Sequence, residues 1–377
     1  MKQRSHSAVL ALLLSVIMAA CTVCAESEVS PPAENSPGAA VYARFNRVET
    51  GVFDTVISLT AFAPSQEDFD RAADEAMSLL RSYHQLLDGY HEYDGLHNLW
   101  YVNHHAAQEP VEVPEEFFRL LSWCREQWDQ GQRKTNIAMG AVLSVWHDYR
   151  MAGIDDPQHA ELPPMETLQA AAQHTDFDSL ILDADNRTVF FADPLLQLDL
   201  GAVAKGYAAD AANAYLSQVM PSYLLSLGGN VYAGEAPMDG RANWRVGVQD
   251  PRINAGNLVN GTSDILDILD VHCKTVVTSG DYWRYYVVDN QRYHHIIDPD
   301  TLYPSVRMQS VSVVCDSSLL ADFLSTTLFI LSYEDGLQLV ESMEGVEAMW
   351  VLPDGTIQCS AGMAAYARSL KSADGGK

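Results

Sequence analysis

The sequence predicts a single mixed α+β domain over residues 42–369, with a largely antiparallel sheet and flanking helices. Apolar residues recur at helical spacing mainly in the first half of the chain, and strand-like runs bounded by turns dominate the second half. No repeat and no internal linker divides this region. Such separation of helices from strands is typical of α+β proteins.

The first half is expected to contain one strand and then helices. The strand covers 52–62, and Ser65 with Asp68 forms a capping box for a helix that runs to residue 87. Residues 88–103 break the helical spacing and are rich in Tyr, His, Asp and Gly, which predicts a surface or site loop. Three further helices are expected at 114–131, 137–149 and 164–174.

The second half is expected to be mainly β structure. Helices are predicted at 203–215, 317–331 and 335–343. Strands are predicted at 179–182, 188–191, 222–227, 244–248, 265–269, 274–277, 283–288, 292–297, 310–314 and 346–352. The Asp- and Asn-rich segments 183–186 and 289–290 predict tight turns between neighbouring strands.

Residues 1–20 predict a signal peptide of the lipoprotein type. Lys2 and Arg4 precede an apolar run that is too short for a stable membrane span. The run ends Met18-Ala19-Ala20-Cys21, which resembles a bacterial lipoprotein box, and cleavage after Ala25 is the alternative. Both alternatives predict export. Residues 21–41, rich in Pro, Ser, Glu and Ala, predict a flexible tether, and 370–377 a tail.

The net charge of −27 argues against non-specific nucleic-acid binding, which needs a basic surface. An anionic ligand therefore requires a local cationic centre, such as a metal, a helix N-terminus or a placed Lys or Arg. Outside the first 41 residues the cysteines are Cys124, Cys273, Cys315 and Cys359, whose spacing fits neither a zinc ribbon nor a redox pair. Buried free thiols are expected, and a disulfide stays open.

Residues 199–210 form the central motif. Asp199, Gly201 and Lys205 precede an alanine-rich helical pattern, so a carboxylate, a turn, a cation and a helix start lie within seven residues. Backbone N–H groups at a helix start, together with a lysine, can hold a phosphate. An ordinary helix start with a turn glycine explains the motif equally well when it is taken alone.

Other short motifs also admit two interpretations. Asp322 and Thr326 share one helix face and can both give oxygen to Mg²⁺, or they belong to an exposed polar face. His294 and His295 are adjacent on an expected strand and so point to opposite faces, which argues against both binding one metal. The motifs 227–230 and 278–282 can line a ligand or form ordinary turns.

In this order, the motifs resemble the ApbE family of FAD:protein FMN transferases. The matching segments are 51–55, 136–141, 199–206, 227–230, 278–282 and 294–299, with Ala321, Asp322 and Thr326. Asn136 departs from the Asp that many relatives carry. The resemblance implies an ApbE or T-fold-like architecture. It also implies Mg²⁺-dependent transfer of FMN from FAD to a Thr or Ser hydroxyl of a partner protein, with release of AMP.

The resemblance also implies roles for individual residues. The metal ligands are the Ala202 carbonyl, the Asp322 carboxylate and the Thr326 hydroxyl. Asp199 and Lys205 contact FAD. The flavin or adenine pocket is lined by Phe53, Tyr93, Ala138, Met139, Gly140 and Ile296. His295 is the candidate base for the acceptor hydroxyl, or a residue that positions the substrate, and Asp281 is a second candidate.

The implied partners are FAD and separate acceptor proteins with a D-x-x-T/S-G-A-T/S-like motif, either membrane redox proteins or extracytoplasmic flavoproteins. Ser279-Gly280 matches only a fragment of that motif, so self-modification is not expected. We expect the chain on the outer face of the bacterial cytoplasmic membrane, anchored through Cys21. The alternatives are an FAD pyrophosphatase giving FMN and AMP, a non-catalytic FAD-binding lipoprotein, and a structural lipoprotein without a ligand.

Overall fold

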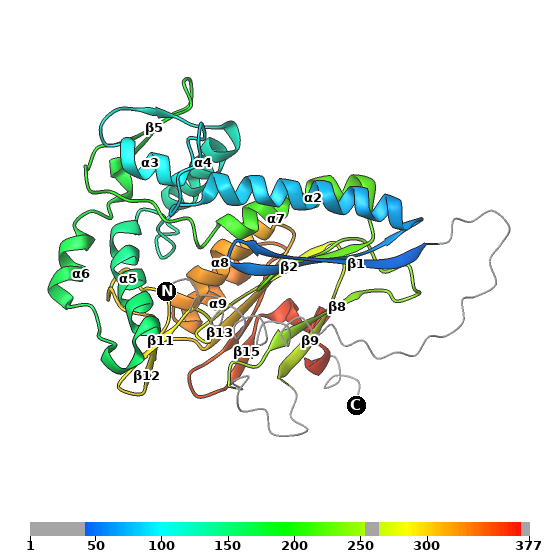
Figure 1. The fold of residues 1–377 in the computed structure, drawn as a ribbon. Helices are drawn as coiled ribbons and strands as arrows, with labels where there is room; N and C mark the ends of the chain where they lie inside the picture. The colour runs from blue at the N-terminus through cyan, green and yellow to red at the C-terminus, as the bar shows by residue number, and fades with distance from the viewer. Residues whose placement is uncertain (1–41, 253–263, 371–377) are drawn as a thin grey trace.

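The computed structural model describes residues 42–252 and 264–370 (Figure 1). The expected signal peptide (1–20) and tether (21–41), and residues 371–377 of the expected tail, lie outside the described residues. Within the described part of the chain, none of the helices combines the length and apolar character needed to cross a bilayer.

An open eight-stranded antiparallel sheet forms the centre of the fold. Its strand order is β1-β2-β6-β7-β10-β13-β14-β15. These strands are β1 (Ala43–Val52), β2 (Thr55–Ala63), β6 (Tyr223–Leu227), β7 (Asn230–Ala233), β10 (Lys274–Gly280), β13 (Ser310–Cys315), β14 (Glu347–Val351) and β15 (Ile357–Cys359). The expectation of an α+β fold with a largely antiparallel sheet is confirmed.

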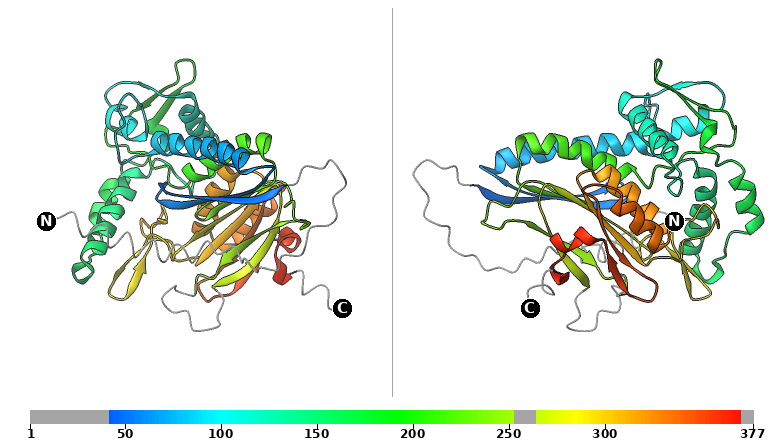
Figure 2. Two further views of the ribbon diagram at one scale, coloured as in Figure 1. Left: turned by 45° about the vertical axis from the view of Figure 1, so that its right-hand side comes forward. Right: turned by 180° about the vertical axis from the view of Figure 1, so that it is seen from behind.

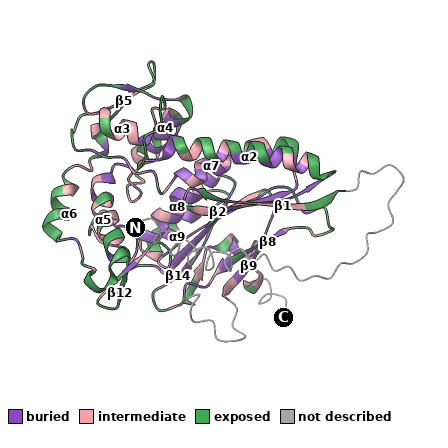
Figure 3. Ribbon diagram, in the orientation of Figure 1, coloured by how far each residue is buried: buried purple, intermediate pink, exposed green. Residues whose placement is uncertain are grey.

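Each face of the sheet is covered by different elements. Helices α2 (Gln66–Leu87), α7 (Ala204–Val219) and α8 (Ser318–Ile330) pack on one face, with α9 (Tyr333–Glu341) beside α8 (Figures 1 and 2). The hairpin of β8 (Trp244–Gln249) and β9 (Ile265–Val271), with the 3₁₀ turn η3 (Ala361–Ala365), covers the other face. Figure 3 shows buried residues concentrated on the sheet and on the inner faces of these helices.

Two smaller units extend from one end of this body. The first contains α3 (Leu99–His105), α4 (Glu115–Asp129), the turn η2 (Phe177–Ser179) and a sheet of β3 (Val111–Glu112), β5 (Thr188–Phe191) and β4 (Leu180–Asp183). The second contains α5 (Gly140–Asp155), the turn η1 (Pro157–His159), α6 (Met165–Ala172) and the hairpin of β11 (Tyr286–Val288) and β12 (Gln291–Tyr293). The buried Trp146 of α5 packs at the centre of the second unit.

Several expected elements differ in the structure. The strand expected at 52–62 is the second arm of a hairpin, whose first arm β1 is mostly exposed and so lacks a strong apolar pattern. The expected loop 88–103 contains the start of α3, which is capped by the Asn98 side chain and stabilised by stacked pairs such as Trp100–His104. A side-chain cap and stacked aromatic rings do not depend on the spacing of apolar residues, so that spacing does not predict this helix.

The structure also corrects two boundaries that concern the site and confirms one turn. Residues 137–139 precede α5 instead of opening it. They are held there because the Asp199 N–H donates to the Ile137 carbonyl and the Gly140 N–H donates to the Gln197 carbonyl. The expected strand 292–297 ends at Tyr293, so His294 and His295 follow the strand and do not lie on it. Asp289 and Asn290 form the expected tight turn, with φ of 50° and 62°.

The four described cysteines are free thiols. Cys124 and Cys315 are buried, as expected, and Cys359 is partly buried. Cys273 is exposed, so the expectation of burial is wrong at that position.

Candidate functional site

The first turn of α7 is capped by a carboxylate from α8. The residue that precedes α7 is Val203, whose side chain cannot cap. The Gly206 N–H instead donates to Asp322 Oδ2 at 2.8 Å, and Lys205 Nζ lies 3.7 Å from Asp322 Oδ1. Only glycine fits at 206, because a Cβ there would clash with the Ser318 carbonyl oxygen and lie 2.7 Å from Asp322 Cβ. The two predicted site residues Lys205 and Asp322 therefore meet.

A second carboxylate makes the reverse contact. Asp210 of α7 accepts hydrogen bonds at the N-terminus of α8, from Ser317 Oγ at 2.7 Å, the Ser318 N–H at 2.7 Å and the Leu319 N–H at 3.0 Å. Each helix thus supplies a carboxylate that caps the start of the other. The central motif of the sequence ends at Asp210. The residues that Asp210 caps lie about 107 positions further along the chain, so the local sequence does not indicate that Asp210 is a helix cap.

Asp199 lies beside the segment that precedes α5. Its backbone N–H donates to the Ile137 carbonyl at 2.8 Å, and the Gly140 N–H donates to the Gln197 carbonyl at 3.0 Å. A Cβ at 140 would approach the Gln197 oxygen to 2.5 Å, so the two segments can pair this closely only with glycine. Asn136 accepts from the Ala138 N–H at 2.8 Å and shapes the same turn.

Three of the predicted pocket residues, Ala138, Met139 and Ile296, have buried side chains. The side chains of Ala138 and Met139 are buried in two hydrophobic clusters. Ile296 is also buried, and its N–H donates to His294 Nδ1 at 3.2 Å.

Two arginines that the sequence analysis does not single out lie close to these residues. The positive charges of Arg150, on α5, and Arg284 lower the pKa of His295. They also oppose the rise in the pKa of Tyr90, which burial causes and the negative charge of Asp199 increases. Arg150 Nη2 donates to His147 Nδ1 at 3.1 Å, and Tyr90 Oη lies 3.4 Å from the same nitrogen. We call Asp199, Lys205, Asp322, His295, Arg150 and Arg284 the charged cluster.

His295 is held neutral within the charged cluster. Burial is the largest cause that lowers its pKa well below the ordinary value, and the positive charges of Arg284, Arg150 and Lys205 lower it further. Its Nδ1 is buried and has no hydrogen-bond partner among the described residues. A neutral imidazole with a free nitrogen can accept a proton at neutral pH.

Phe53 reaches the charged cluster through its backbone. Phe53 and Asp54 form the tip of the β1–β2 hairpin with φ of 53° and 51°. The Phe53 carbonyl accepts from Arg284 Nη2 at 3.4 Å, and the Phe53 N–H donates to His84 Nδ1 at 3.3 Å. The predicted flavin contact at Phe53 is therefore placed beside Arg284.

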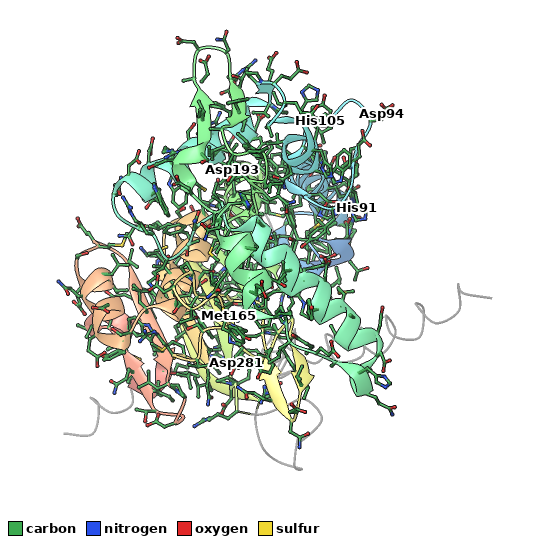
Figure 4. The ribbon with its side chains drawn as sticks, turned by 90° about the vertical axis from the view of Figure 1, so that its left-hand side faces the viewer. His91, Asp94, His105, Met165, Asp193 and Asp281 are labelled. Carbon is green, nitrogen blue, oxygen red and sulfur yellow. The ribbon has the colours of Figure 1, made fainter. Side chains whose placement is uncertain are left out.

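Two predicted site residues have partners elsewhere. Tyr93 Oη donates to Asp88 Oδ2 at 3.0 Å. In the same loop, Tyr90 is the tyrosine whose pKa the negative charge of Asp199 raises. The Asp281 N–H donates to the Gln309 carbonyl, and Arg292 is the cation that acts on its carboxylate. Figure 4 shows Asp281 well below His91 and Asp94 of the tyrosine-rich loop. Burial raises the pKa of Asp281 to about 6.

The candidate metal ligands offer only oxygen atoms. Asp322 is buried, and burial raises its pKa although Lys205 and the Gly206 N–H oppose that effect. Thr326 is half-buried one turn further along α8, and Ala202 is half-buried just before α7. No group of three or more His, Cys, Asp or Glu side chains that could hold a metal occurs in the described ranges. A carboxylate, a hydroxyl and a carbonyl fit a hard cation such as Mg²⁺ rather than zinc.

Comparison with known proteins points to one family. Residues 53–350 match the sequence model of the ApbE family. A protein of Treponema pallidum named FAD:protein FMN transferase is 33% identical over 313 residues, which cover 79% of this chain and 82% of the relative. A Klebsiella pneumoniae protein of the same name is 33% identical over 253 residues, 66% of this chain and 73% of the relative.

Solved structures show the same fold. The crystal structure of the ApbE protein of Thermotoga maritima aligns with a TM-score of 0.72 at 26% identity, covering 87% of this chain and 100% of that one. The flavin transferase ApbE of Vibrio cholerae aligns with a TM-score of 0.70 at 22% identity and the same coverage. The second likeness concerns the fold alone.

Proposed function

The chain belongs to the ApbE family and is a transferase, and from that premise we propose that it moves FMN from FAD to a Thr or Ser hydroxyl of a separate protein and releases AMP. One observation carries the proposal. Lys205, in the first turn of α7, lies 3.7 Å from the Asp322 carboxylate of α8, and its positive charge lowers the pKa of His295. That arrangement provides a cationic helix start, an acidic group and a neutral base together.

The chain's own residues can support each part of the transfer. Lys205 and the first turn of α7 offer positive charge to the phosphate of FAD that is transferred. The acceptor oxygen forms a new bond to that phosphorus, and the bond from the phosphorus to the oxygen of AMP breaks. The hydroxyl proton passes to neutral His295. FAD and the acceptor thus give the FMN-modified acceptor and AMP.

Mg²⁺ fits the proposed site. The Asp322 carboxylate, the Thr326 hydroxyl and the Ala202 carbonyl would hold it, since they are the oxygen donors that such an ion prefers. When bound, the ion neutralises charge on the phosphates. Asp322 then has two functions, because it also accepts the hydrogen bond from Gly206.

The decisive experiment follows both products. The full chain is incubated with FAD and Mg²⁺, with and without a protein domain that carries the D-x-x-T/S-G-A-T/S-like motif. We expect AMP release and an FMN adduct on the acceptor, detected by mass spectrometry. Asp322→Ala should abolish both, while Glu334→Ala, which removes an exposed carboxylate on α9, should retain both. Full transfer by Asp322→Ala would contradict the metal assignment.

The same experiment tests the hydrolytic alternative. An FAD pyrophosphatase would use water in place of the acceptor hydroxyl at the same residues. Rapid AMP and FMN formation without the acceptor domain, and no adduct when it is present, would establish the hydrolase. An FAD-binding protein without catalysis would raise the melting temperature with FAD and release no AMP.

We also propose that the chain is exported and lipid-anchored through Cys21 on the outer face of the cytoplasmic membrane. The support is the sequence of the first 21 residues, which lie outside the described part of the structure. There it would meet membrane redox proteins or extracytoplasmic flavoproteins as acceptors. Labelling of cells with a radioactive fatty acid should mark the wild-type chain and not Cys21→Ser, and an unlabelled wild type would contradict the anchor.

A further inference from the structure

His294 is a buried histidine whose two ring nitrogens both form hydrogen bonds to the main chain. Its Nε2 donates to the Ser305 carbonyl at 2.9 Å, and its Nδ1 accepts from the Ile296 N–H at 3.2 Å. Because an N–H group can only donate and a carbonyl can only accept, the ring is the neutral tautomer that carries its proton on Nε2. Burial lowers the pKa of His294 to about 4, which agrees with a neutral ring.

The hydrogen bond to Nδ1 closes a turn that has His295 at its centre. The Ile296 N–H belongs to the peptide bond that follows His295, so the His294 ring fixes the orientation of that peptide. Asn and Asp side chains form similar turns with the N–H two residues further along the chain. The next peptide is also held, because the Ile296 carbonyl accepts from the Ser305 N–H at 3.0 Å. Two successive peptide groups after His295 therefore have fixed partners.

The same turn is anchored to α8. Ser305 Oγ donates to the Phe329 carbonyl at 3.1 Å. The His294 ring packs edge-on against the Phe329 ring, with 5.4 Å between the ring centroids and 76° between the planes. Phe329 lies on α8 about two turns after Asp322 and three residues after Thr326. His294 therefore connects the segment of the candidate base to the helix that carries two of the candidate metal ligands.

The ring of His295 has no comparable anchor. Its Nδ1 is buried and lacks a hydrogen-bond partner within the ranges 42–252 and 264–370. In catalytic histidines the second ring nitrogen is often fixed by a carboxylate or a backbone carbonyl. Without such a partner, the position of the His295 imidazole depends on the main chain that carries it. His294 is the side chain that holds this main chain in place.

We infer that His294 is a positioning residue for FMN transfer, which fixes the His295 imidazole relative to α8 through its hydrogen bonds to Ile296 and Ser305. This inference rests on the proposed function, in which His295 accepts the proton of the acceptor hydroxyl. The alternative is that His294 only stabilises the fold. Packing against Phe329 needs no polar ring, and burial of an imidazole is costly unless its nitrogens are hydrogen-bonded. Both bonds lie within the loop that carries His295, which favours the positioning role.

Two substitutions separate the two hydrogen bonds of His294. The asparagine amide occupies about the position of Nδ1 and the glutamine amide about that of Nε2, so His294→Asn can keep the bond from Ile296 and His294→Gln the bond to Ser305. AMP release and adduct formation are measured with the full chain, FAD, Mg²⁺ and the acceptor domain. We expect His294→Gln to lower kcat about 10- to 100-fold with little change in KM for FAD, since small displacements of a catalytic group have effects of this size. His294→Asn should lose less. The control is His272→Gln, which replaces an exposed histidine beside β9.

A double variant distinguishes positioning from stabilisation. In the His295→Gln background, His294→Gln should cause no further loss of kcat, because the residue that it positions is already gone. Equal losses in both backgrounds, or a wild-type kcat in folded His294→Gln, would overturn the inference.

A milder substitution covers the case in which His294→Gln does not fold. Ser305→Ala removes only the hydroxyl bond to Phe329. It should lower kcat in the wild-type background and not in the His295→Gln background, and an equal loss in both would count against positioning. If the wild-type chain gives neither AMP nor adduct from FAD, the proposed function itself fails and the positioning role fails with it. Equal losses in an active chain overturn the positioning role alone.

Discussion

The Asp322 carboxylate accepts a hydrogen bond from the Gly206 N–H at 2.8 Å, across the contact between α8 and α7. This bond joins the helix that carries the candidate metal ligands to the helix that offers the candidate phosphate site. Asp210 makes the reverse contact to the start of α8. The relative position of the two helices is therefore set by hydrogen bonds at two points about one helical turn apart.

Gly206→Ala should separate the two helices. The added Cβ would clash with the Ser318 carbonyl and lie 2.7 Å from Asp322 Cβ, so either helix must shift. We expect a loss of about 1–3 kcal/mol in the free energy of unfolding and a large loss of FMN transfer. Gly336→Ala in α9 is the control, because its nearest neighbour is a flexible Leu328 methyl at 3.3 Å. Urea unfolding and the transfer assay together measure both effects, and normal transfer by Gly206→Ala would contradict the expected shift.

Asp210→Ala should weaken the same contact from the other side. It removes hydrogen bonds to Ser317, Ser318 and Leu319, which we expect to cost about 1–3 kcal/mol of stability. Transfer should also require more Mg²⁺, because α8 carries Asp322. Ser332→Ala removes the ordinary cap of α9 and serves as control, with lower stability and an unchanged Mg²⁺ requirement. An equal Mg²⁺ requirement in both variants would limit Asp210 to a stabilising role.

The transfer rate should stay flat as pH falls through 6.5. His295 must be neutral to accept a proton, and its pKa lies well below 6.5 because of burial and of Arg284, Arg150 and Lys205. The rate should fall only at clearly lower pH. Arg284→Gln removes one of the positive charges and should move that midpoint upward, while His295→Gln should lose about 10²–10⁴-fold at every pH. A wild-type midpoint near 6.5 in kcat would show that His295 is not the titrating base.

Stability should fall as the solution is acidified, in part because of His294. Burial lowers the pKa of this histidine to about 4, and its Nε2 donates to the Ser305 carbonyl while Nδ1 accepts from Ile296. Between pH 6.5 and 4 the unfolded chain gains a proton that the folded chain does not, so acid favours unfolding by up to about 3 kcal/mol. Urea unfolding of His294→Gln at pH 7 and pH 4.5 should show a smaller drop than wild type, and equal drops would contradict this.

Asp281→Asn should stabilise the protein above pH 6 and keep its activity. Burial raises the pKa of Asp281 to about 6, so the stability linked to its protonated form is present at low pH and is lost as pH rises through 6. Asparagine removes that loss, and we expect a gain of about 1–2 kcal/mol at pH 8 after solvent screening is allowed for. Thermal unfolding at pH 5 and pH 8 measures it. A hundredfold loss of transfer would instead support Asp281 as the base.

The fold class and several site residues follow from local sequence patterns. Lys205 and Asp322 are recognisable because each sits at a helix position whose spacing and residue type are visible in a short window. The strand β1 is not recognisable from apolar residues, since two of the three half-buried positions in its alternating pattern are the charged residues Arg47 and Glu49. The extent of the tyrosine-rich loop is also mispredicted, because Asn98 starts α3 through a side-chain cap.

The contributions of Arg150, Arg284 and Asp210 depend on tertiary contacts and could not be predicted from the sequence. Arg150 follows a predicted helix, and Arg284 lies near the start of the predicted strand 283–288, so neither differs locally from a surface arginine. Their charges act on His295 in a fold that packs α5 against β11, the strand that begins two residues after Arg284. Asp210 was likewise hidden, since its partners belong to the distant start of α8.

The cap on α7 comes late in the synthesis of the chain. Gly206 precedes Asp322 by 116 residues, so at ordinary rates of translation the nascent helix waits roughly ten seconds for its carboxylate. Until then its first N–H groups face solvent, and the phosphate site has no fixed partner. A chain truncated before α8 would keep the central motif and six of the eight strands of the main sheet, yet lack the assembled site. Catalytic competence should therefore be among the last properties that the growing polypeptide acquires.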